Sequence, residues 1–190
     1  MSLTKIRMGV VPIGNVPEIT VKTIAAHILG YLNLDADILP PLKHPNYAHD
    51  EKRLQYNAGA IIKSLELEAF HDYSKVIGVL DVDIFVPILT HVFGEAKQGG
   101  KYALVSLYRL RKQQDGSASP MTVLLQRGAK VALHESGHLF NLLHCMDEQC
   151  LMHFSGELQD LDRVPLYFCR YCSTYFRDAL RREIKKTVIT

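Results

Sequence analysis

The sequence lacks tryptophan, has no cysteine before position 145, and has no apolar run close to the roughly 20 residues that cross a bilayer. It also lacks an excess of either charge, because 22 lysines and arginines stand against 20 acidic residues. The short apolar runs argue against a membrane protein. The net charge of +2 argues against general binding of polyanions, which requires a strong basic excess. We therefore expect neither a membrane nor a nucleic acid as a partner.

What is present suits one compact globular unit. The chain has 190 residues, of which 47% are hydrophobic, and this composition excludes wholesale disorder. Residues 1–5 lead into a short apolar run without a small-residue cleavage site, so we predict no secretory signal. We expect a cytoplasmic protein that acts as a monomer.

The four cysteines are confined to the last 46 residues. A secreted fold held by disulfides is usually smaller and has its cysteines spread along the chain. Clustering without a signal peptide points instead to a metal site in a reducing compartment. Two disulfides remain the alternative.

The first half of the chain alternates between predicted strands and helices. Strands are expected at 6–13, 34–41 and 76–80, and helical spacing of apolar residues is found at 18–33 and 51–69. This β-α-β-α-β order favours a parallel sheet with right-handed crossovers.

The pattern changes after residue 84. The segment 102–108 has the alternation of a strand, and the Gly99-Gly100 turn makes 92–97 a plausible antiparallel edge strand beside it. Ser119 and Pro120 then resemble an N-cap and a first helical residue, and a helix is predicted from there to about Phe140. We expect an α/β fold with a mixed, mostly parallel sheet and one antiparallel edge strand.

The predicted helix ends with the pattern H-E-x-x-H at residues 134–138. Residues four apart share one helix face, so His134 and His138 can reach one tetrahedral zinc ion. Glu135 points away from that ion and suits action on a zinc-bound water. The five-residue motif alone is moderately specific.

A third histidine, His144, makes the prediction stronger. On a straight helix it would lie about 120° around from His138 and would miss the metal. The helix must therefore end between them, and Asn141 is the residue that must turn the chain. Metzincins, the zinc-peptidase clan that this pattern resembles, have glycine there. Asparagine is the next most tolerant residue of a left-handed backbone.

The residues after His144 narrow the resemblance to the archaemetzincins. The third histidine is followed by Cys145, four residues, Cys150, one residue and Met152, and then by the pair Cys169 and Cys172. The 16 residues between Met152 and Cys169 are about one fewer than in the family pattern. The matching motifs span 134–172, and the segment 93–110 is also similar to the family.

The resemblance implies a metzincin-like twisted sheet, an active-site helix and a small C-terminal subdomain stapled by zinc. It places the boundary so that 1–141 form an N-terminal α/β subdomain and 142–190 carry the third histidine and the cysteines. Met152 would be the apolar floor beneath the catalytic metal. The four thiols fit a second, closed structural zinc site, giving two zinc ions per chain.

Three histidine ligands leave a coordination position open for water, which zinc makes acidic while it polarises a substrate carbonyl. Glu135 would accept the water proton and pass it to the leaving amine. The predicted activity is therefore zinc-dependent hydrolysis of peptides or proteins.

Two alternatives remain open at this stage. One is a peptide-binding module that keeps the fold and the zinc but turns over weakly or not at all, which the departure at Asn141 allows. The other is a cysteine zinc ribbon that grips nucleic acid through the tail 170–190, which holds six basic and two acidic residues. The tail more often forms the solvated face of a terminal helix.

Overall fold

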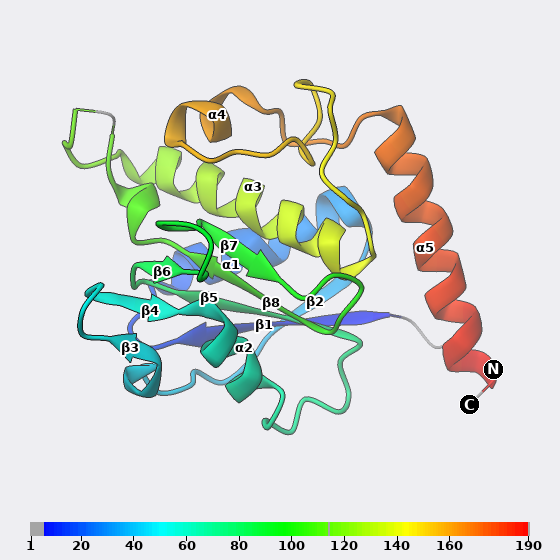
Figure 1. Cartoon of the computed structure of the whole chain (residues 1–190). Helices are drawn as coiled ribbons and strands as arrows, with labels where there is room; N and C mark the ends of the chain where they lie inside the picture. The colour runs from blue at the N-terminus through cyan, green and yellow to red at the C-terminus, as the bar shows by residue number, and fades with distance from the viewer. Residues whose placement is uncertain (1–5, 114, 190) are drawn as a thin grey trace.

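A computed structural model describes residues 6–113 and 115–189, with side chains described as far as residue 185. Its main sheet has five strands in the order β2-β1-β5-β8-β7 (Figure 1). Their bounds are β1 Arg7–Ile13, β2 Asp35–Ile38, β5 Lys75–Leu80, β7 Gly94–Ala96 and β8 Tyr102–Ser106. The sequence prediction of a mostly parallel sheet with one antiparallel edge is confirmed, because only β7 pairs antiparallel with its neighbour in this sheet.

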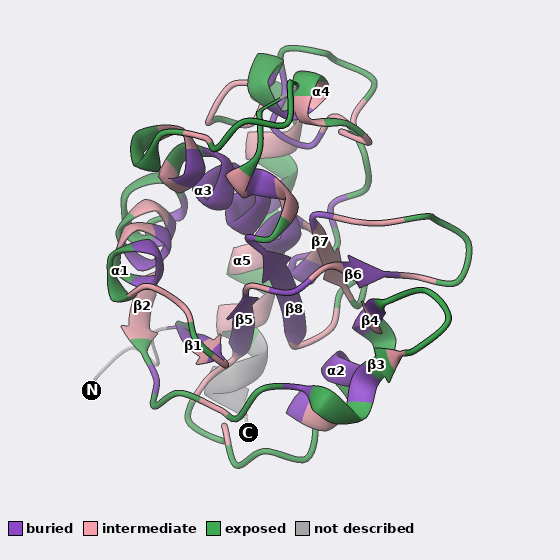
Figure 2. Cartoon of the chain, turned by 90° about the vertical axis from the view of Figure 1, so that its left-hand side faces the viewer, coloured by how far each residue is buried: buried purple, intermediate pink, exposed green. Residues whose placement is uncertain are grey.

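Strand β5 is the centre of the sheet, and every one of its residues is buried. It pairs in parallel with β1 on one side and β8 on the other. Strands covered on both faces are expected to be continuous apolar runs, as the sequence KVIGVL is after its first lysine. Figure 2 shows this burial in β5, β8 and the neighbouring helix α3.

Helices cover both faces of the sheet (Figure 1). One face packs against α1 (Glu18–His27) and α3 (Met121–Leu139), and their apolar residues share one core. The other face packs against α2 (Ala58–Leu65), whose Ile61 and Leu65 are buried with Leu104 of β8. The expected helix at 18–33 is present, although its last turn, η1 at Ile28–Leu32, is a π-helix.

The helix predicted at 51–69 is only partly correct. The structure has strands at β3 His49–Asp50 and β4 Gln55–Asn57, after a 3₁₀ turn η2 at Asn46–Ala48. These strands join β6 (Ile84–Phe85) in a small second sheet. The helix cannot start earlier because Leu54 has a left-handed backbone, with φ at 53°. Asn57 then caps α2, since its side chain accepts a hydrogen bond from the Ala60 N–H at 3.0 Å.

Helix α3 crosses the core, and two of its buried basic side chains bind neighbouring segments. Pro120 occupies the N-cap position, which differs from the predicted Ser119 cap. The Ser119 hydroxyl instead accepts a hydrogen bond from Arg127, whose guanidinium also makes a two-pronged ion pair with Asp162. Lys130, 4% exposed, donates to the carbonyls of Leu161 and Asp162. These buried cations fix α4 (Leu158–Arg163) against α3.

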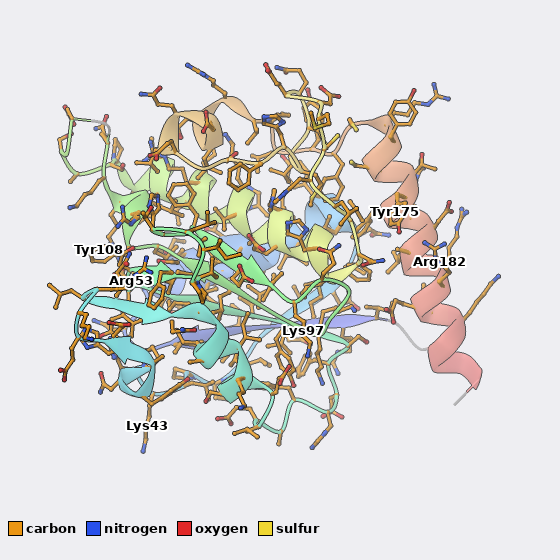
Figure 3. The ribbon with its side chains drawn as sticks, in the orientation of Figure 1. Lys43, Arg53, Lys97, Tyr108, Tyr175 and Arg182 are labelled. Carbon is orange, nitrogen blue, oxygen red and sulfur yellow. The ribbon has the colours of Figure 1, made fainter. Side chains whose placement is uncertain are left out.

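The C-terminal helix α5 (Arg170–Ile189) packs against the end of α3. The Phe176 ring lies 4.9 Å from the Phe140 ring, and the buried Lys75 of β5 pairs with Glu183. Tyr175 and Arg182, labelled in Figure 3, are exposed residues of the same helix. The side chains of 186–190, part of the predicted basic tail, lie outside the described residues. Among the described helices none is long and apolar enough to cross a membrane.

Gly78 lies in a tightly packed part of the sheet face that α2 covers, and we predict that it tolerates no side chain. A Cβ there would lie 2.7 Å from Ile13 Cδ1 and 2.9 Å from Leu104 Cδ2. We expect Gly78→Ala to lower the free energy of unfolding by about 1–3 kcal/mol, because such overpacking forces neighbours out of their rotamers. Urea denaturation measures the change.

Gly30→Ala is the matched control, since a Cβ at Gly30 would meet nothing within 4 Å. Equal stability of the Gly78 variant and this control would contradict the packing at the sheet centre.

Candidate active site

Helix α3 ends in a tight turn at Asn141. The Leu142 N–H donates to the Gly137 carbonyl at 3.0 Å, and the Asn141 N–H donates to the His138 carbonyl at 2.9 Å. These two bonds define a Schellman motif, which requires a left-handed residue between them. Asn141 takes that conformation, with φ at 68°. The chain therefore leaves the helix axis directly after the H-E-x-x-H turn.

This turn brings His144 beside the two helical histidines. The rings of His134 and His144 are 5.3 Å apart, and those of His138 and His144 are 4.9 Å apart. One ring nitrogen from each of the three lies within 4.8 Å of the others. The structure thus assembles the three predicted ligands around one point.

The hydrogen bonds of His134 and His138 leave their facing nitrogens without a proton. His134 Nδ1 lies 2.7 Å from the Leu151 carbonyl, and His138 Nδ1 lies 2.8 Å from the Leu142 carbonyl. A carbonyl only accepts, so both Nδ1 atoms carry the proton and both Nε2 atoms carry a lone pair. The two Nε2 atoms are 3.1 Å apart, so they repel unless a cation lies between them. Two nitrogens bound to one tetrahedral zinc are about 3.3 Å apart, so the residues fit this ion.

Burial keeps all three imidazoles neutral at pH 7. It lowers the pKa of His134 to about 3, with a smaller contribution from the neighbouring His138. Burial is also the main cause that lowers the pKa of His138 and of His144. Neutral imidazoles are the form that binds a metal ion.

Glu135 lies on α3 between the first two histidines, and it is 6% exposed. Burial raises the pKa of its carboxyl well above the usual value, and the Glu95 carboxylate adds to the rise. A cation at the three imidazoles would act in the opposite direction. Strand β7 approaches so closely that a Cβ at Gly94 would lie 2.6 Å from Glu135 Oε1. Glycine at this position therefore gives the carboxyl its room.

A cleft of about 310 Å³ opens over these residues. One wall is β7 with the segment before it, and the opposite wall is formed by residues 143–144 and 154–156. Glu135 and the three histidines line the cleft, and so do the partly exposed apolar side chains of Leu89, Leu143 and Phe154. The arrangement can admit an extended chain to the carboxyl and the imidazoles together.

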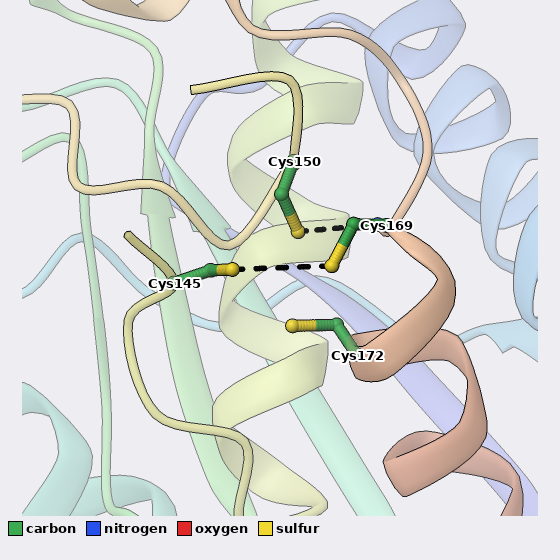
Figure 4. Close-up of side chains that lie close together, drawn as sticks. All are labelled: Cys145, Cys150, Cys169 and Cys172. Carbon is green, nitrogen blue, oxygen red and sulfur yellow. Dashed lines mark hydrogen bonds between the residues drawn. The ribbon is translucent and has the colours of Figure 1, made fainter. Parts of the chain in front are cut away.

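The four cysteines form a second cluster (Figure 4). Their sulfur atoms lie within 4.8 Å of one another, and all four thiols are free. The Cys145 and Cys169 sulfurs are 3.9 Å apart, and the Cys169 N–H donates to the Cys150 sulfur. Burial raises the pKa of the Cys150 and Cys172 thiols, which favours their protonated form. A cation bound by the four sulfurs would be needed to keep these thiols deprotonated. Four thiolates at this spacing fit a structural zinc ion.

The segment 144–153 joins the two clusters. It contributes His144, two cysteines and the Leu151 carbonyl that orients His134. Met152 is fully buried against Gly137, where a Cβ would collide with its sulfur, so it lies beneath the histidine-bearing turn. His153 Nδ1 donates to the Cys145 carbonyl at 3.1 Å, and His153 takes no place among the clustered histidines.

Comparison with known proteins identifies the family. A model of peptidase family M54 matches residues 30–178. The chain belongs to this family. It is 36% identical over 172 residues to the archaemetzincin of Methanocaldococcus jannaschii, a match that covers 90% of this chain and 93% of that protein. It is 33% identical over 180 residues to the archaemetzincin of Pyrococcus furiosus, covering 91% and 93%.

Solved structures of archaemetzincins have the same fold. The crystal structure from Methanopyrus kandleri superposes with a TM-score of 0.83 at 31% identity, over 94% of this chain and 97% of that one. The structure of the Archaeoglobus fulgidus archaemetzincin in complex with malonate superposes with a TM-score of 0.78 at 30% identity, over 90% of this chain and 99% of that one. The resemblance to archaemetzincins stated from the sequence is confirmed. Membership of the M54 family makes this protein a zinc metallopeptidase that acts on peptides or proteins.

Several groups around the site were not anticipated from the sequence. The carbonyls of Leu142 and Leu151 orient two histidines, and no side-chain pattern announces a backbone acceptor. Gly94 and Gly137 each give room to a site residue. An isolated glycine inside a strand or helix pattern is a sign of close approach and could have pointed to both.

The left-handed backbone at Asn141 generates a stability prediction. Asn141→Val should lower the free energy of unfolding by about 1–2 kcal/mol, the cost of a side chain branched at Cβ in this conformation. Asn141→Gly should stay within about 1 kcal/mol of the parent, because glycine adopts the conformation freely. Chemical denaturation of both variants measures the difference. A valine variant as stable as the glycine variant would show that residue 141 does not hold this turn.

Proposed function

We propose that this M54 peptidase hydrolyses peptide bonds at a zinc ion held by His134, His138 and His144. The observation that carries the proposal is the pair of unprotonated Nε2 atoms 3.1 Å apart, each backed by an Nδ1–H bond to a carbonyl. Such carbonyl partners fix the tautomer and the ring orientation of metal-binding histidines. His144 completes a set of three and leaves room for solvent and substrate in the cleft.

Zinc bound in this place would act as a Lewis acid and lower the pKa of water toward neutrality. The residues of the chain supply the rest. Glu135 accepts the proton of the attacking water and returns it to the departing amine, a role that its burial in the cleft suits. The missing side chain at Gly94 leaves the space beside β7 in which this carboxyl lies.

We further propose that Cys145, Cys150, Cys169 and Cys172 hold a second zinc ion with a structural role. The closed cluster of four sulfurs offers no open position for a substrate. Its function would be to fix the segment 144–153, which supplies the third histidine and the Leu151 carbonyl. Each chain would then carry two zinc ions and act as a monomer.

The alternative of a peptide-binding module without turnover rested on asparagine in place of glycine at 141. Asn141 takes the left-handed conformation that glycine would take, so this departure alone gives no reason to expect an inactive site. The nucleic-acid alternative required the cysteines to act apart from the histidines. The shared segment 144–153 argues against that separation.

Replacing the base should abolish turnover and keep the metal. We expect Glu135→Gln to reduce kcat/KM by about 10²- to 10⁴-fold, the usual contribution of a general base. Mass spectrometry of the products from a mixed peptide library measures cleavage, and metal analysis should find unchanged zinc. Glu51→Gln, at an exposed residue that does not line the cleft, is the control. Equal cleavage by Glu135→Gln and the parent would rule out Glu135 as the base.

Metal analysis tests the two-site proposal. Freshly purified parent protein should contain about two zinc ions per chain, and Cys172→Ser and His144→Ala should each lose about one. A chelator should remove the zinc of the His144 site first, because an open site exchanges more readily. A parent protein with a single zinc would contradict the two sites.

A further inference from the structure

The turn between β7 and β8 is clamped onto the end of α3. The Gly99 N–H donates to the His138 carbonyl at 2.8 Å, adding to the bond that this carbonyl accepts from Asn141. Gly99 has φ at 64°, and a Cβ there would lie 3.2 Å from Asn141 Oδ1. The end of the helix therefore depends on a turn about 40 residues earlier in the chain.

Gln98 belongs to the same turn, and its side chain contacts the chain just after α3. Its Nε2 donates to the Leu142 carbonyl at 2.8 Å and lies 3.4 Å from Asn141 Oδ1. Because both neighbours are acceptor oxygens, the amide must present its nitrogen to them and not its oxygen. The orientation of the Gln98 amide is thus fixed by its surroundings.

The Leu142 carbonyl is also the acceptor of the His138 Nδ1–H bond. A carbonyl oxygen has two lone pairs, so it can take both donors at once. Gln98 and His138 therefore donate to one and the same oxygen. Any movement of the Leu142 peptide would rotate the His138 ring.

We propose that Gln98 is a positioning residue for the metal ligand His138. By donating to the Leu142 carbonyl, it fixes the acceptor that holds the His138 ring and directs its Nε2 to the metal. The inference rests on the proposed function, because it assumes zinc at the three histidines. Gln98 also lines the cleft, so it links the turn of the edge strand to the metal ligand.

The test compares four variants by their zinc affinity at the histidine site, measured by chelator competition with the cysteine site filled. Gln98→Met removes the donor, Gln98→Glu replaces it by an acceptor, and Gln98→Lys keeps a donor. Lys97→Met is the control from the same turn (Figure 3), where Lys97 pairs with Glu66, the residue directly after α2. Denaturation midpoints show that each variant is folded.

We expect the methionine and glutamate variants to bind zinc about 3- to 10-fold more weakly, somewhat less than the loss from removing a direct partner of a ligand. The lysine variant and the Lys97 control should stay within about twofold of the parent. With saturating zinc, the methionine variant should lose kcat while KM changes little.

Unchanged zinc affinity in Gln98→Met and Gln98→Glu would overturn the inference. An equal loss in Gln98→Lys would also overturn it, since the side chain would then act by packing and not by donating. Failure of the parent itself to bind zinc at the histidines is a different outcome. It would refute the proposed function and with it the premise of this inference.

Discussion

The site depends on where one helix ends. His134 and His138 share a helix face, but the third imidazole reaches them only because the backbone reverses its hand at Asn141. The reversal is held by two helix-ending hydrogen bonds and by the Gly99 N–H from the β7–β8 turn. Two consequences follow from it. The rings of three histidines meet at one point, and the chain continues directly into the segment that holds the cysteines.

The histidine cluster and the cysteine cluster share one segment of the chain. The segment 144–153 gives a ligand and an orienting carbonyl to the histidine cluster, and it gives Cys145 and Cys150 to the other. Met152 fills the space between this segment and Gly137 on α3. A metal in the cysteine cluster would therefore stabilise the geometry of the histidine cluster. The buried cations Arg127 and Lys130 hold α4 against the N-terminal half of the same helix.

The sequence predicted the parts of the fold that a simple period describes. The buried strand at 76–80 and the long helix ending near 140 are present, because their apolar patterns are strong, and the edge strand beside 102–108 is present where the Gly99-Gly100 turn predicted it. The helix predicted at 51–69 is shorter at both ends in the structure, where it runs from Ala58 to Leu65. Leu54 fits a helical stripe in the sequence, but it has a left-handed backbone and is 75% exposed. A local turn thus overrode the apolar spacing.

The candidate site was also predictable only where a sequence pattern describes it. Histidines, cysteines and the turn at Asn141 could be located from spacing, because their chemistry belongs to side chains. The groups that orient them could not, because the Leu142 and Leu151 carbonyls carry no residue signature and Gln98 reaches its partner across 44 positions of sequence. The Gln98 contact exists only after the sheet has placed the β7–β8 turn beside the end of α3, and the Leu151 carbonyl reaches His134 only after the segment 144–153 has folded back on the helix. These two contacts are therefore a product of the tertiary fold.

The central claim is that the turn at Asn141 brings three neutral imidazoles to one zinc ion that keeps a free position. Crystals of the purified protein, measured at the zinc absorption edge, test this most directly. The account predicts an anomalous peak about 2.0–2.1 Å from one nitrogen each of His134, His138 and His144, with no fourth protein atom bound. A peak from which His144 is turned away, or one closed by another side chain, would contradict it.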